Sequence, residues 1–223
     1  QKFAQDAFVG LGGILTVFTV IGVIFMPALV TMMASGFIGT ERFDLAVYYG
    51  RIAFPYILFI SLSALLSGVL NATGRFTAAA AAPVLLNIIF VTALVITSLR
   101  VGTDQAIVMG QSLAYAVPVA GIAQLALVWF AAKRSGYTLK VGRPRLTPEL
   151  RRLAIIAAPA ALAGGGVQIN LLVGRQVASF FEGAVAWLNY ADRLYQLPLG
   201  VVGIAIGVGR LPDLSRKLSA GDD

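Results

Sequence analysis

Long stretches without a single charged side chain constrain this chain more than any other feature. They lie at 7–40, 52–74, 76–99, 105–132 and 153–174, and a sixth at 183–209 is interrupted only by Asp192 and Arg193. A helix needs about 20 mainly apolar residues to cross the roughly 30 Å of bilayer hydrocarbon. The sequence therefore predicts an all-α, polytopic membrane protein with six transmembrane helices joined by short links.

Composition supports this fold class and narrows the chemistry. Only 12% of the 223 residues are charged, whereas a soluble domain carries about 25%, so the chain cannot cover a water-exposed surface. Because it contains no His and no Cys, it lacks an imidazole base, a thiolate nucleophile and the usual zinc ligands. The composition therefore argues against an enzyme, and we predict no catalytic residue, no metal site and no cofactor.

Lys and Arg residues gather on one side of the predicted spans. Cytoplasmic loops accumulate these residues, so both ends of the chain are expected in the cytoplasm and the turns at 36–45, 100–104 and 175–183 outside. The cytoplasmic set comprises Lys2, Arg75, Lys133, Arg134, Lys140, Arg143, Arg145, Arg151, Arg152, Arg216 and Lys217. The net charge of +7 then reflects topology and attraction to anionic headgroups of the bilayer, and we expect no nucleic-acid partner.

A polar segment divides the chain into parts. Thr147-Pro148-Glu149 supplies the cap, the proline and the acid that typically start a helix. We predict four transmembrane helices in 1–135, a basic cytoplasmic connector with a short amphipathic helix in 136–152, and two helices that open a second bundle in 153–223. Since the chain starts with Gln1 and ends abruptly, we expect it to be an excerpt from a longer protein.

Asp192 and Arg193 are ionisable residues deep inside a predicted span. Such residues cost about 2.5–3.5 kcal/mol at mid-span and call for a partner or a water-filled cavity. Residues at helical spacing form one stripe there: Asn189, Arg193, Gln196, Gly200, Gly203 and Gly207. In one interpretation the glycines allow tight helix packing and the charges are neutralised. In the other, the stripe lines an aqueous cavity in which Arg193 presents a forked cation to an anionic ligand.

Glycines and prolines mark candidate bends in the last two spans. Three consecutive glycines centred on Gly165 precede Gln168 and Asn170, and this pattern fits a hinge or a close helix contact. Pro198 and Gly200 are the corresponding candidates in the sixth span. We predict that these five residues line the cavity or act as hinges.

Polar residues of the earlier spans have structural explanations. Arg51 is expected at the start of the second span, where it can snorkel toward the headgroups. Asn71 and Asn87 are predicted to join helices by hydrogen bonds.

Four segments together form a distinctive pattern. They are Arg51-Ile-Ala-Phe-Pro-Tyr-Ile, Ser61-Leu-Ser-Ala-Leu-Leu-Ser-Gly-Val-Leu-Asn71, Ala82-Pro-Val-Leu-Leu-Asn-Ile88 and Asn189-Tyr-Ala-Asp-Arg-Leu-Tyr-Gln-Leu-Pro-Leu-Gly. The sequence resembles the MurJ (MviN) family of lipid II flippases in these segments, and the resemblance extends over essentially the whole chain. The Tyr-Ala-Asp-Arg-Leu motif is the most specific of them.

The resemblance implies part of a two-lobed transporter fold of the MOP superfamily, with a cavity that opens alternately to each side of the bacterial inner membrane. The implied substrate is lipid II, the peptidoglycan precursor on undecaprenyl diphosphate, carried to the periplasmic leaflet. Arg193 matches an essential cavity arginine of the family, at the diphosphate, and Asp192 matches its acidic neighbour. The stripe adds Asn189 and Gln196 to this substrate-binding set.

The same resemblance aligns the six spans with the third to eighth helices of the family. The remaining helices of the full-length protein are therefore expected partners. Arg210 stands where the family has an aliphatic residue. Two other functions stay open: a different exporter of the same superfamily, for drugs or another polyprenyl-linked glycan, and a non-transporting scaffold that recruits cell-wall enzymes through its basic connector.

Overall fold

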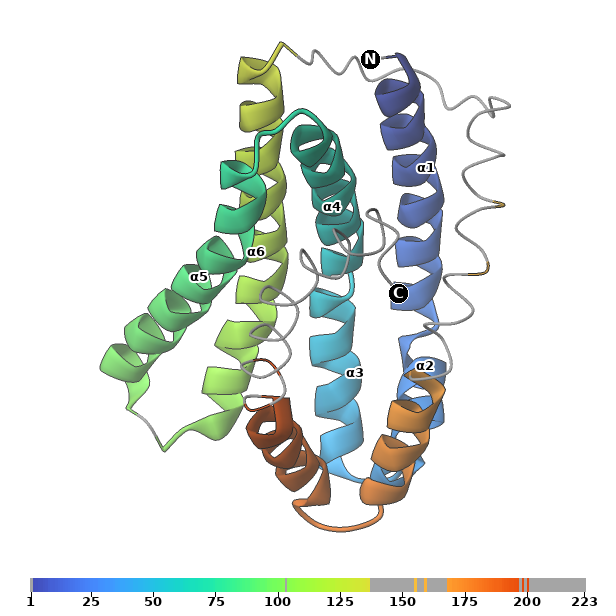
Figure 1. Ribbon diagram of the computed structural model, residues 1–223. Helices are drawn as coiled ribbons and strands as arrows, with labels where there is room; N and C mark the ends of the chain where they lie inside the picture. Colours follow the sequence, from blue (N-terminus) through green and yellow to red (C-terminus); the bar gives the residue numbers. More distant parts are fainter. Residues whose placement is uncertain are drawn as a thin grey trace, which may run out of the picture.

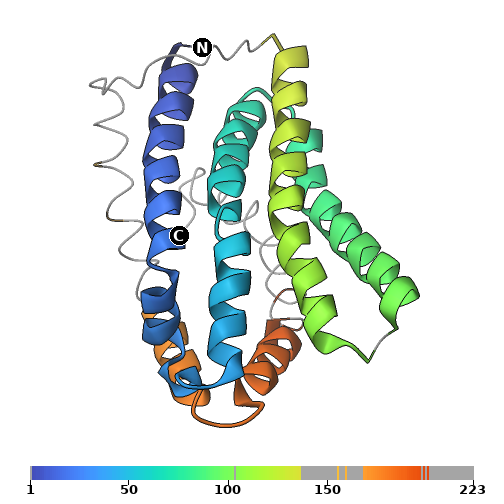
Figure 2. The same cartoon turned by 180° about the vertical axis from the view of Figure 1, so that it is seen from behind.

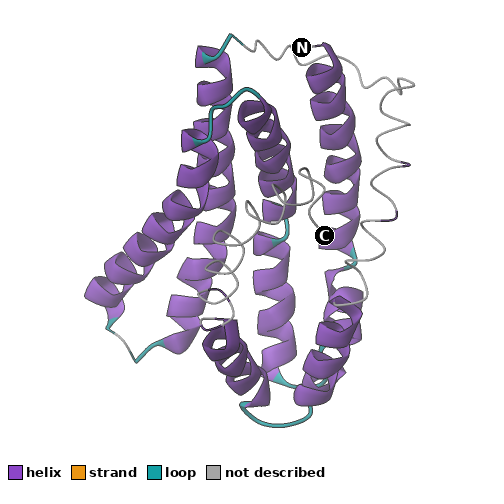
Figure 3. Ribbon diagram, viewed as in Figure 1, coloured by secondary structure: helices purple, strands orange, loops and turns teal. Residues whose placement is uncertain are grey.

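The described part of the chain consists of helices joined by turns. The computed structural model describes residues 2–102, 104–136, 155, 159, 168–196, 198 and 200. Its elements are α1 (Lys2–Ile24), α2 (Met26–Met33), the short 3-10 helix η1 (Ser35–Phe37), α3 (Glu41–Ala53), α4 (Tyr56–Ala72), α5 (Thr77–Val101) and α6 (Ala106–Arg134). Helical residues at 168–178 and 184–196 form a later hairpin. Figure 3 shows no strand among these described residues, so the predicted all-α class is confirmed.

Four helical segments are long and apolar enough to cross a membrane, which confirms the first four predicted spans. They are Gln5–Ile24, Glu41–Ala72, Thr77–Val101 and Ala106–Arg134. The second differs from the prediction because the helix starts at Glu41 rather than at residue 52. The helix begins in a charged stretch that includes Arg42 and Asp44, and its apolar part follows. The predicted connector and most of the fifth span lie outside the described residues, as does the second half of the sixth.

The turns alternate between two ends of the molecule, as the sequence predicts. In Figures 1 and 2 the start of α1, the α4–α5 turn and the end of α6 share one end. The turns around η1, between α5 and α6, and at 179–183 share the other end. We call these the basic end and the distal end, because Arg75, Lys133 and Arg134 lie at the first.

Helix α6 is the centre of the four-span body. It packs against α3, α4 and α5, and α4 also contacts α1. Near the basic end, Leu66, Leu70, Ala82, Val128 and Ala132 form a buried apolar cluster. The ring of Phe8 from α1 meets Trp129 edge-on, with ring centroids 5.3 Å apart. Apolar side chains thus hold the body together at this end, while α5 splays away from α6 toward the distal end (Figure 1).

One buried glutamine joins three helices. Gln124 of α6 is 2% exposed. Its Oε1 accepts a hydrogen bond of 3.1 Å from the Tyr56 hydroxyl on α4, and its Nε2 donates one of 2.8 Å to the Ala82 carbonyl on α5. Asn71 and Asn87, which the sequence suggested for this role, are exposed and make no side-chain hydrogen bond within the described residues. Gln124 and Tyr56 therefore form the interhelical hydrogen bonds that the sequence predicted for Asn71 and Asn87.

Replacing Gln124 by leucine should destabilise this body by about 1–3 kcal/mol, because interhelical hydrogen bonds in membranes are worth roughly 0.6–1.7 kcal/mol each and Tyr56 would keep an unpaired hydroxyl. The free energy of unfolding of the purified full-length protein in mixed micelles measures the effect. Asn87→Leu is the matched control and should change little. Equal destabilisation by both variants would contradict the assignment.

Each of the first two spans has a break next to a proline, Pro27 between α1 and α2 and Pro55 between α3 and α4, and the two breaks lie side by side. Pro27 has no N–H to donate to the Val23 carbonyl one turn earlier, and the helix breaks at Phe25 between α1 and α2. Arg51 Nε lies 3.3 Å from this freed Val23 oxygen and donates to it. Arg51 therefore lies about 15 Å along the helix from Glu41, directly before the apolar stretch that starts at residue 52, and its predicted position at the start of the second span stays a prediction.

The kinked pair interlocks through glycines. A Cβ added to Gly22 of α1 would overlap the ring of Phe54, which lies in the break between α3 and α4. A Cβ added to Gly50 of α3 would approach the Met26 sulfur to 2.7 Å. Phe54 thus packs against Gly22 of the first span, and Met26 packs against Gly50 of the second span. This exchange fixes the register of the two spans.

Candidate functional site

Asp192 and Arg193 lie on the second helix of the hairpin. The backbone turns at 179–183, where Gly183 has a positive φ of 76°, and becomes helical again over 184–196. The hairpin approaches the body near η1 at the distal end, with its second helix in front of α3 and α6 in Figure 1. Arg193 is ten residues beyond the turn, so it lies about 15 Å from the distal end of this helix.

The side chain of Arg193 has no partner in the described part of the chain. It is exposed, and no carboxylate or carbonyl of the described residues pairs with it. Asp192 is half-buried on the adjacent helix face and likewise forms no ion pair with Arg193. Neighbours in a helix point about 100° apart, which explains why these two charges do not neutralise each other. A guanidinium of this kind can hold an anion with two parallel N–H groups.

The other predicted site residues divide into two groups. Asn189, Arg193 and Gln196 share one exposed helix, and the Asn189 amide donates a hydrogen bond of 2.9 Å to the Val185 carbonyl of its own helix. Gln168 and Asn170 are exposed on the first helix of the hairpin. The cavity and hinge roles of these residues stay predictions.

The remaining hinge candidates are only partly described. Pro198 is exposed and Gly200 is half-buried, and both are helical. A Cβ on Gly200 would meet nothing within 4 Å. Gly165, Gly203 and Gly207 lie outside the described residues.

A polar cluster between α3 and α6 escaped the sequence analysis. The hydroxyls of Tyr48 and Tyr115 lie 3.0 Å apart, and Gln111 Nε2 donates to Tyr48 over 3.2 Å. The Tyr49 hydroxyl donates to the Ile107 carbonyl at 2.8 Å. Gln111 and Tyr115 lie within the fourth predicted span and Tyr48 and Tyr49 just before the second, but which of these residues meet depends on how α3 packs on α6.

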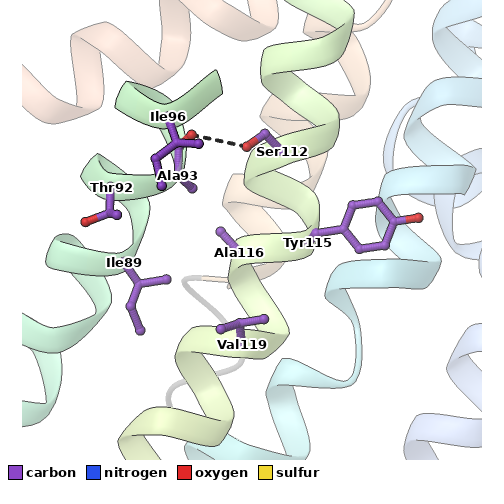
Figure 4. A pocket seen from close by; sticks show the side chains of 8 residues that line it. All are labelled: Ile89, Thr92, Ala93, Ile96, Ser112, Tyr115, Ala116 and Val119. Atoms are coloured by element: carbon purple, nitrogen blue, oxygen red, sulfur yellow. Dashed lines mark hydrogen bonds between the residues drawn. The ribbon is translucent and has the colours of Figure 1, made fainter. Parts of the chain in front are cut away.

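The cavity between α5 and α6 has a different character from the Arg193 region. Its volume is about 330 Å³, and Figure 4 shows Ile89, Ile96 and Val119 among its lining residues. The Ser112 hydroxyl donates to the Ala93 carbonyl at 3.4 Å, whereas the Tyr115 ring points away from α5 (Figure 4) and its hydroxyl meets Tyr48 of α3. No charged side chain and none of the predicted site residues lines this cavity. It suits an apolar group, not an anion.

The chain is similar to a well-defined set of proteins. A family model described as "Lipid II flippase MurJ" matches residues 1–223. A probable lipid II flippase MurJ of Rhizobium tropici is 42% identical over 223 residues, which cover 99% of this chain and 42% of that protein. The lipid II flippase MurJ of Burkholderia cenocepacia is 37% identical over 208 residues, covering 91% and 39%.

More distant relatives match over the same region. A probable lipid II flippase MurJ of Rickettsia prowazekii is 33% identical over 223 residues, covering 100% of this chain and 43% of that protein. The chain thus spans about two fifths of the length of the curated relatives it matches.

Proposed function

The chain belongs to the lipid II flippase MurJ family, and from this premise we propose that the full-length protein moves lipid II across the bacterial inner membrane. The peptidoglycan precursor, linked to undecaprenyl diphosphate, passes from the cytoplasmic to the periplasmic leaflet by alternating access. In this proposal the four-span body belongs to a first lobe, the connector at 136–152 stays cytoplasmic, and the hairpin opens a second lobe.

The observation that carries the proposal is that the guanidinium of Arg193 pairs with no residue of the described part of the chain. A cation inside a membrane span is costly unless water or an anion meets it, and Arg193 has no carboxylate partner among the described residues. A diphosphate offers the oxygens that the fork of an arginine holds best. Arg193 therefore attracts the diphosphate into a hydrated cavity, and the prenyl tail stays in lipid.

Neighbouring residues then complete the headgroup site. Asn189 and Gln196 lie one turn before and one turn after Arg193 on the same helix face, so their amides can reach polar groups next to the diphosphate. Asp192 sets the local charge and disfavours a second anion. The membrane potential, negative inside, adds about 2.3 kcal/mol per charge per 100 mV in favour of outward movement of an anion.

Transport by the purified full-length protein in proteoliposomes tests the function. Fluorescent lipid II placed in one leaflet should become accessible in the other at a rate that rises with the amount of protein. Undecaprenyl phosphate without the disaccharide-peptide serves as the comparison lipid, and empty vesicles give the background.

The alternatives predict different results in the same assay. A scaffold would give no transport at full length. An exporter of another polyprenyl-linked glycan or of drugs would move its own cargo and leave lipid II in place. Either outcome would refute the proposed substrate.

A further inference from the structure

The tip of the hairpin contacts the four-span body through a compact set of polar contacts at the distal end. The Ser35 amide donates to Gln176 Oε1 at 3.1 Å, and the Gln176 side-chain amide donates back to the Ser35 hydroxyl. The Gly36 amide donates to Ser179 Oγ at 3.0 Å. These groups come from η1 and from the end of the helix at 168–178, and about 140 residues separate them in sequence.

Gly36 allows this approach. A Cβ at this position would overlap the backbone of Ser179 and come within 2.6 Å of the Phe180 nitrogen. Backbone atoms cannot turn aside as a flexible side chain can, so any larger residue at position 36 must push the two segments apart. Ala178 and Ser179 are 5% exposed at this contact.

An ion pair stands at the edge of the same contact. Arg42 of α3 and Glu182 of the hairpin turn lie 2.6 Å apart, with side chains 50% and 86% exposed. Such exposed pairs contribute little to stability and are screened by salt. Arg42 and Glu182 therefore guide the two parts into register, and the hydrogen bonds around Gly36 hold them.

The rest of the described hairpin is scarcely buried. Ala178 and Ser179 are its buried residues, whereas large apolar side chains on both of its helices and in its turn are exposed, among them Val173, Phe180, Trp187 and Leu194. The described contact with the body is thus small, polar and confined to the tip. A contact of this type can open at the water interface without exposing a large apolar area.

We propose that η1 and the hairpin tip form a latch that closes the distal side of the molecule. The latch comprises Ser35, Gly36, Gln176 and Ser179, with Arg42 and Glu182 at its edge. It holds the state in which the distal side is shut, and it must release when the headgroup leaves on that side. This inference rests on the proposed alternating access and adds the contact that has to break in each cycle.

Cross-linking across the latch tests it directly. The chain contains no cysteine, so Arg42→Cys and Glu182→Cys introduce a defined pair at the edge of the latch, where the two native side chains are in contact and are 50% and 86% exposed. Cysteines elsewhere in the full-length protein are replaced first. A thiol-reactive cross-linker with a reducible spacer should abolish lipid II flipping in proteoliposomes, and reduction should restore it. Normal flipping by the cross-linked protein would overturn the latch.

Spin labels on the same cysteine pair measure opening without any substrate. The wild-type background should show a short distance, and Gly36→Ala should reduce the population at that distance about tenfold, the factor that corresponds to loss of ordinary hydrogen bonds. The double variant Gln176→Ala/Ser179→Ala should act in the same direction without a steric clash. Gly68→Ala, where the structure leaves open space around the new Cβ, is the matched control and should match the wild type.

These two measurements separate the latch from the transport function. If the uncross-linked protein flips no lipid II but the latch variants lengthen the distance, the proposed function fails and the latch stands. If the distances in both latch variants equal those of the wild type, the latch is refuted whatever the protein transports.

Discussion

Replacing Arg193 by alanine in the full-length protein is expected to lower the rate of lipid II flipping by at least about 30-fold, because removal of a hydrogen-bonded charge contact typically costs 2–5 kcal/mol. The variant loses the charge that attracts the diphosphate and the fork that orients it. Binding of labelled lipid II to the purified protein should weaken in parallel. Arg193 has no partner within the described residues, so its removal should leave no carboxylate there unpaired and should spare folding.

Two further variants sharpen this expectation. Arg193→Lys keeps the charge but cannot form the two parallel hydrogen bonds, so it should retain only part of the activity. Arg100→Ala removes an exposed guanidinium from the last turn of α5 and should flip at the wild-type rate. Membrane insertion and the elution profile in detergent must be equal for all variants. Wild-type flipping by a properly inserted Arg193→Ala protein would refute the role of this residue.

Hydropathy predicted the helical class and the first four spans because charge-free length is a property of the sequence alone. It could not show where the helix that carries the second span begins. A helix ends where its backbone hydrogen bonds end, and α3 begins at Glu41, before the apolar stretch. Arg51 consequently lies within a helix, and it donates to the Val23 carbonyl freed by Pro27. A count of charges cannot reveal such a partner.

In the candidate site, too, the sequence predicted features within one helix and missed contacts between helices. The stripe through Asn189, Arg193 and Gln196 is a periodicity within one helix, so the sequence could predict it. The latch pairs η1 with a hairpin tip about 140 residues later, and the Gln124 junction joins three helices. Contacts of this kind depend on how helices pack, and spacing along the chain carries no information about them.

The kinked pair of the first two spans has its own requirement, since the ring of Phe54 occupies the space beside Gly22. Phe18 also meets Phe54, with ring centroids 5.7 Å apart. This second contact restricts where the Phe54 ring can move. A side chain at position 22 must therefore displace a ring that Phe18 of the same helix also contacts, and Phe54 lies in the break between α3 and α4.

Gly22→Leu should destabilise the full-length protein by about 3 kcal/mol, at the upper end of the range for overpacking. Phe54→Ala should cost about 3–5 kcal/mol through the cavity it leaves. Because the new leucine fills part of that cavity, the double variant should be more stable than the sum of the two effects predicts, with a coupling of about 0.5–3 kcal/mol. Unfolding free energies in mixed micelles complete this cycle, and Gly13→Leu, where a new Cβ meets open space, is the control. Strict additivity of the two substitutions would show that Gly22 and Phe54 do not pack against each other.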